Sequence, residues 1–161
     1  MNRRSIVIAA TILFAFIMAT AAMAADDPFT GTWKLNPAKS KAPGGRLPHP
    51  RSTNVIEVKG QTVHLTADES DAEGQALHVE YTALYDGKEY PVKQTPPSNE
   101  KYTITVKRID RRTVEWVEYI GKITIKGQDL LSEDGKTFSR VVNLTDAGGH
   151  DLSVVQFFEK Q

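Results

Sequence analysis

The chain has 161 residues, with 20 basic and 20 acidic side chains, 40% apolar residues and no cysteine. A chain of this length and composition forms one compact domain and is neither a disordered tail nor a fibre. The balanced charge argues against a nucleic-acid-binding protein, which usually carries a basic surplus. The absence of cysteine excludes disulfides, thiolate metal sites and a thiol nucleophile.

Residues 1–24 have the pattern of a secretory signal peptide. Arg3 and Arg4 precede an apolar run over residues 6–22, and Ala22-Met23-Ala24 supplies the small-x-small pattern that signal peptidase cleaves. We therefore expect cleavage after Ala24, leaving residues 25–161 as one domain that is periplasmic or secreted and not stably inserted in a membrane. The alternative is an uncleaved transmembrane anchor, because the run approaches the roughly 20 residues that span a bilayer.

The rest of the chain reads as β-strands from end to end. Apolar and polar residues alternate in short runs, and turn residues such as Asp-Gly pairs separate these runs. No stretch combines helical periodicity with capping residues. The pattern predicts about ten strands, over residues 33–35, 55–58, 62–67, 77–85, 89–92, 102–107, 114–120, 123–131, 138–144 and 152–158.

Short connections make sequential strands antiparallel neighbours, which gives an all-β meander. A meander of this length has two long unpaired edges unless it closes on itself, so we predict an up-and-down barrel, with a β-sandwich as the alternative. Two segments are too long and too rich in proline for tight turns, residues 37–52 and 91–100. Both are predicted to be irregular loops, either lids over a site or plain connections.

The start and the end of the predicted domain carry a family resemblance. The run Gly31-Thr32-Trp33-Lys34-Leu35 resembles the Gly-x-Trp start of the calycins, which include the lipocalins and the fatty-acid-binding proteins. The terminal Phe157-Phe158-Glu159-Lys160 resembles the last strand of the fatty-acid-binding type. Most of the domain, including the stretch from Tyr85 to Pro91, is similar to secreted bacterial lipocalin-like proteins of undefined role. This resemblance implies a calycin barrel.

The sequence departs from the fatty-acid-binding proteins where that family binds lipid. The proline-rich segment 37–52 cannot supply the two helices that follow the first strand in that family. Gln156 and Phe158 stand where the family has the arginine and tyrosine that hold the lipid carboxylate. An amide and a phenyl ring cannot form that charge-assisted pair. The resemblance therefore implies a fold more strongly than a ligand.

Period-two alternation directs several candidate ligand-binding side chains into the barrel. Arg140 shares a face with apolar residues and needs a partner, for which Glu118 is the candidate. Arg140 is either an anion hook or, as in the lipocalins that this chain resembles, an arginine stacked on Trp33. As an anion hook, Arg140→Met keeps the fold and weakens the binding of an anionic ligand. The other candidates are aromatic residues that also serve as core, Trp33, Tyr81, Tyr102 and Trp116.

A pair of histidines suggests a weak metal site. If the hairpin turns about Asp71, His64 lies opposite His78 on the outer face, with Glu80 as a third ligand. The alternative is an incidental surface pair, since two ligands hold zinc poorly. No cofactor is expected.

Known catalytic motifs are missing from the sequence, including Gly-x-Ser-x-Gly, His-Glu-x-x-His and the phosphate-binding glycine loops. The leading hypothesis is an exported, non-enzymatic barrel that binds a small hydrophobic or amphipathic molecule in its interior. The alternative is a structural or interaction protein of the cell envelope with a filled barrel.

Overall fold

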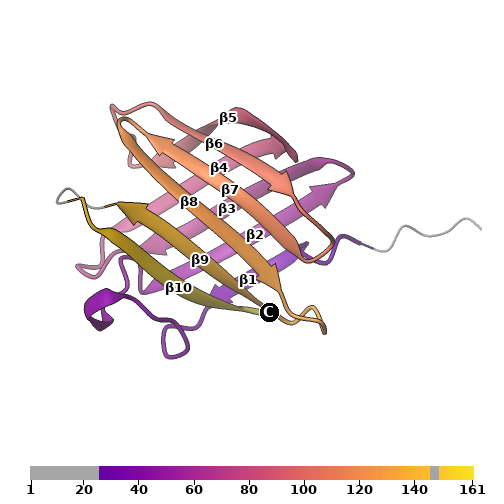
Figure 1. Ribbon diagram of the computed structural model, residues 1–161, viewed down its shortest axis with the longest axis horizontal. Helices are drawn as coiled ribbons and strands as arrows, with labels where there is room; N and C mark the ends of the chain where they lie inside the picture. The colour runs from indigo at the N-terminus through magenta and orange to yellow at the C-terminus, as the bar shows by residue number, and fades with distance from the viewer. Residues whose placement is uncertain (1–25, 146–148) are drawn as a thin grey trace, which may run out of the picture.

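A computed structural model describes residues 26–145 and 149–161. The predicted signal peptide and its cleavage site lie outside these residues. Ten antiparallel strands form a closed barrel (Figure 1). The strands are β1 (Gly31–Leu35), β2 (Arg51–Lys59), β3 (Thr62–Ser70), β4 (Ala76–Leu84), β5 (Asp86–Thr95), β6 (Tyr102–Arg108), β7 (Thr113–Ile120), β8 (Ile123–Leu131), β9 (Thr137–Thr145) and β10 (Asp151–Lys160).

The order of the strands confirms the predicted meander and its closure. Each strand pairs with the next in sequence, and β1 pairs with β10 to complete the ring. The sandwich alternative is wrong. All ten predicted strands are present, and most extend beyond their predicted bounds because the apolar alternation stops before the backbone pairing does.

The two predicted loops are shorter than expected. Pro91 to Thr95 belong to β5, and Arg51 and Ser52 belong to β2. The segment between β1 and β2 contains one short 3₁₀ turn, η1 (Pro43–Gly45), and no α-helix, so it does not supply the two helices of the fatty-acid-binding proteins, as predicted. This segment, residues 36–50, is called the lid loop below. In Figure 1 it lies beyond the left-hand ends of the strands.

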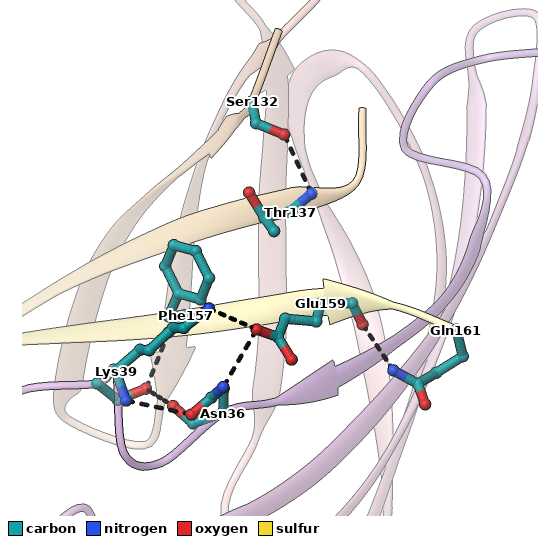
Figure 2. A network of polar contacts seen from close by, with 8 residues as sticks. Asn36, Lys39, Ser132, Thr137, Phe157, Glu159 and Gln161 are labelled. Carbon is teal, nitrogen blue, oxygen red and sulfur yellow. Dashed lines mark hydrogen bonds and ion pairs between the residues drawn. The ribbon is translucent and has the colours of Figure 1, made fainter. Parts of the chain in front are cut away.

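Polar contacts reinforce the seam where the barrel closes (Figure 2). The Glu159 carboxylate accepts hydrogen bonds from Asn36 Nδ2 at 3.1 Å and from Lys39 Nζ at 2.8 Å. These donors lower the pKa of Glu159. The Gln161 backbone N–H also donates to the Thr32 carbonyl oxygen at 2.9 Å. The start of the lid loop is thereby tied to the last strand.

Aromatic side chains fill the end of the barrel opposite the lid loop. Trp33, Phe138 and Phe158 are fully buried, and their rings are in contact: the Phe138 centroid lies 5.0 Å from that of Trp33 and 4.6 Å from that of Phe158. Phe29 packs against the same cluster at 6.2 Å from Phe138. This half of the barrel is therefore a packed core.

An ion pair covers this packed end. Arg108 pairs with Asp27 at 2.7 Å, and its guanidinium lies 4.3 Å from the centre of the Tyr85 ring. Burial raises the pKa of Tyr85 to about 12. Tyr85 therefore belongs to the packed end of the barrel.

Candidate functional site: an interior cavity under the lid loop

The half of the barrel beneath the lid loop is hollow. It contains a cavity of about 380 Å³, closed on one side by Pro48 and His49 of the lid loop. Inward-facing residues of most strands form its wall, because alternate side chains of each strand point to the same face. The apolar part of the wall comprises Leu65, Ala67, Leu77, Val79, Ile104, Ile120, Ile125, Val142, Leu144 and Val154.

Four of the five predicted ligand-binding side chains line this cavity. They are Tyr81, Tyr102, Trp116 and Arg140, from β4, β6, β7 and β9. Trp33 is not among the lining residues. It is fully buried in the packed half, and its Nε1–H donates to the Phe29 carbonyl oxygen at 2.8 Å. Trp33 is therefore a core residue, the role that the sequence favoured over ligand contact.

Arg140 faces inward as predicted, but the partner and the ring contact predicted for it are wrong. Its Nε and Nη2 donate to the two carboxylate oxygens of Asp129, at 2.8 and 2.7 Å. Asp129 lies directly opposite Arg140 in the pairing of β8 with β9, whereas Glu118 lies on β7. Trp33 instead stacks with Lys160. The Arg140 guanidinium lies 5.3–5.5 Å from the ring centres of Trp116, Phe138 and Phe158.

This ion pair is buried and well satisfied. Asp129 is 5% exposed, and its Oδ1 also accepts a hydrogen bond from Trp116 Nε1 at 3.1 Å. Burial alone would lower the pKa of Arg140, but the charge and hydrogen bonds of Asp129 outweigh it and raise that pKa. Arg140 therefore stays cationic and is already neutralised by a protein carboxylate.

A glycine on β8 makes room for the cavity tryptophan. Gly127 lies directly opposite Trp116, and a Cβ atom at position 127 would come within 2.0 Å of the indole ring. The indole therefore lies flat over the β8 backbone, where its N–H reaches Asp129 two residues further along the strand. This placement lets one wall of the cavity be aromatic without filling the space.

Glu118 is a second carboxyl in the cavity wall. Tyr102, Tyr81, Glu69 and Arg140 line the same cavity from other strands. Burial raises the pKa of Glu118, and the nearby Tyr102 hydroxyl and the Arg140 charge only partly oppose that rise. Burial likewise raises the pKa of Tyr102.

The raised pKa of Glu118 predicts a pH-dependent effect of Glu118→Gln. Above the ordinary glutamate pKa of about 4.3, the unfolded chain releases this proton before the folded chain does, so wild-type stability falls as pH rises. Glutamine removes that loss. We therefore expect the stability of Glu118→Gln relative to wild type to increase from about pH 4 to neutrality, as measured by urea unfolding. Glu115→Gln, exposed on the same strand, is the control. A difference that does not change with pH would contradict the prediction.

Sequence reasoning missed a polar corner of the site beside the lid loop. The Ser52 hydroxyl donates to Glu69 Oε1 at 3.0 Å, and the other Glu69 oxygen lies 3.9 Å from His49 Nδ1. Two buried nitrogen atoms in this corner, His49 Nδ1 and Asn54 Nδ2, have no hydrogen-bond partner. The sequence held one sign of this corner: Ser52 and Asn54 occupy alternate positions on β2 that point into the barrel. Nothing in the sequence indicated where the lid loop packs.

The predicted opposition of His64 and His78 is wrong. His64 pairs with Thr82 across the strands and His78 with Asp68, because the hairpin turns about Glu73 rather than Asp71. The imidazoles contact those same partners, with Nδ1 to oxygen distances of 2.9 and 2.7 Å. The two histidines are thus four positions apart along the strand pair, on the order of 13 Å. They cannot share one metal ion.

Within residues 26–145 and 149–161, no three histidine, aspartate or glutamate side chains are grouped so that they could hold a metal ion. The same part of the chain contains no helix with the length and apolar character needed to cross a membrane.

Comparison with known proteins bears on the fold. No family model and no curated protein sequence matches the chain. The zebrafish ileal bile acid-binding protein, crystallised with cholic acid, aligns over 83% of this chain and 99% of its own at 13% identity, with a TM-score of 0.55. The chain has a calycin-type barrel fold.

Two other solved barrels align over the same share of this chain. A protein named EF1p2_mFAP2b, bound to DFHBI, aligns over 94% of its own length, with 11% identity and a TM-score of 0.49. The redesigned barrel mFAP1, also bound to DFHBI, aligns over 95% of its length, with 13% identity and a TM-score of 0.45.

Proposed function

We propose that this calycin-type barrel binds a small, largely apolar molecule in its interior. The observation that carries the proposal is the cavity of about 380 Å³ under the lid loop, which has the size and the mainly apolar lining of ligand pockets. The zebrafish protein with this fold was crystallised with cholic acid, which supports the idea that a barrel of this kind accommodates a small molecule.

The alternative, an envelope protein with a filled barrel, fits only half of the structure. The aromatic cluster around Trp33 is packed, but the half beneath the lid loop is not. We also propose that the protein catalyses no reaction. The missing catalytic motifs support this, as does the Arg140–Asp129 ion pair, in which both groups already satisfy each other.

Filling the cavity tests the binding proposal. Ala67 lies in the cavity wall on β3, so Ala67→Phe places a ring in the space for a ligand. We expect this variant to bind Nile red, a neutral apolar dye, at least about tenfold more weakly than wild type after delipidation. Thr66→Phe, on the outer face of the same strand, adds equal bulk as the control. Fluorescence titration measures both, and equal affinities for all three proteins would place the dye outside the barrel.

We further propose that the protein is exported and that the mature chain begins at Ala25. The basic start, the apolar run and the Ala22-Met23-Ala24 pattern support this proposal. The intact mass of protein recovered from the cell envelope is expected to correspond to residues 25–161. A mass that includes residues 1–24 would instead indicate a membrane anchor.

A further inference from the structure

The charges in the cavity wall do not favour an anionic ligand. Arg140 lines the cavity. Its guanidinium already donates hydrogen bonds to both carboxylate oxygens of Asp129. The rings of Trp116, Phe138 and Phe158 lie around its guanidinium. A ligand carboxylate would have to displace Asp129 and leave it unpaired in a buried site, which is strongly unfavourable. The formally neutral pair therefore offers no free anion site.

Two other carboxyl groups face the same space. Glu69 has Ser52 and His49 beside it in the polar corner. Glu118 lines the cavity next to Tyr102, and it forms no ion pair with any lysine or arginine in the part of the chain that the structure describes. Since Arg140 and Asp129 neutralise each other, Glu118 and Glu69 give the cavity wall its acidic character. Burial raises the pKa of Glu118, and the charge of Arg140 only partly opposes that rise.

Aromatic rings stand beside Glu118. Tyr102 lies two residues along β6 from Ile104, which pairs with Glu118, and both Tyr102 and Tyr81 line the same cavity as Glu118. The faces of aromatic rings attract organic cations, and a carboxylate among aromatic rings is suited to an ammonium group. The remaining wall is apolar and suits a hydrocarbon chain.

We propose that the cavity selects an apolar molecule that carries an ammonium group, with Glu118 as its counter-charge and Tyr81 and Tyr102 as its aromatic neighbours. This inference rests on the proposed function, the binding of an apolar molecule in the barrel, and names the chemical class of that molecule. The acidic cavity excludes carboxylate amphiphiles by charge, although their hydrocarbon chains would fit equally well.

The test compares two amphiphiles that share a chain and differ in charge. Dodecyltrimethylammonium and dodecanoate, below their micelle-forming concentrations, compete with bound Nile red. Neither head group changes its charge near neutral pH. In the wild-type protein the ammonium compound is expected to displace the dye at concentrations at least about tenfold lower than dodecanoate. In Glu118→Gln this ratio should fall by about tenfold or more, whereas Glu115→Gln should retain it.

The ratio of the two displacing concentrations cancels any effect of a substitution that weakens the binding of both amphiphiles equally. Equal displacement, or a preference for dodecanoate, would overturn the inference while leaving the proposed function intact. A wild-type preference that persists in Glu118→Gln would also overturn it, because the selectivity would then arise elsewhere. Failure of the wild-type protein to bind Nile red at all would overturn the proposed function itself, and the inference with it.

Discussion

Arg140→Met is expected to lower the free energy of unfolding by about 3–5 kcal/mol, because it leaves the Asp129 carboxylate buried without its partner. Methionine keeps the bulk of the side chain but supplies neither of the two donors that now hold Asp129. The sequence pattern alone predicted that this variant keeps its fold and weakens the binding of an anionic ligand. The buried ion pair adds the expectation of a large loss of stability. Urea unfolding followed by tryptophan fluorescence measures the loss.

A second substitution separates the loss of the pair from the loss of packing. In Arg140→Met/Asp129→Asn the buried charge is gone, and the amide oxygen still accepts from Trp116. We expect this double variant to recover more than half of the lost stability. Arg111→Met, at an exposed position in the β6–β7 turn, is the control and should match wild type. A double variant no more stable than Arg140→Met would show that packing, not charge, dominates at this position.

Trp33→Ala is expected to cost about 3–5 kcal/mol as well, for a different reason. The indole is completely buried against Phe138, and its N–H bonds to the Phe29 carbonyl oxygen, so alanine leaves both a void and an unpaired acceptor. Lys34→Ala, exposed at the next position, should have little effect. Thermal and urea unfolding measure both variants.

Ligand binding distinguishes a core tryptophan from a binding one. Trp33→Phe retains most of the packing and should bind Nile red as wild type does, because Trp33 does not line the cavity. If Trp33→Phe folds normally but loses the dye, Trp33 belongs to the binding site after all. This would contradict its assignment to the packed half of the barrel.

The architecture was predictable because alternation and turn residues are local signals. The inward parity of Tyr81 and Tyr102 follows from the same alternation. The register of a hairpin is a weaker signal. A shift of four residues between β3 and β4 leaves the same side chains pointing inward, so the pattern cannot detect it. The error moved His64 and His78 apart without changing the core.

The partner of Arg140 could have been found by the same arithmetic. The turn at Asp134-Gly135 sets position 129 opposite position 140, which is the pairing observed. The placement of the lid loop could not have been found, because residues without periodicity carry no information on where they pack. His49 and Pro48 reach the cavity through that unpatterned segment, and with them came the polar corner around Glu69.

Closure of the barrel by its first and last strands has a consequence for how the chain folds. The contact between Lys39 and Glu159 joins residues 120 positions apart, and β1 pairs with β10 over a similar span. A growing chain therefore cannot complete the ring until β10 has been made, and contacts this distant in sequence slow folding. Until then β1 and the newest strand present open edges to other chains. The barrel can therefore close only when synthesis is nearly finished, which is compatible with the export proposed above.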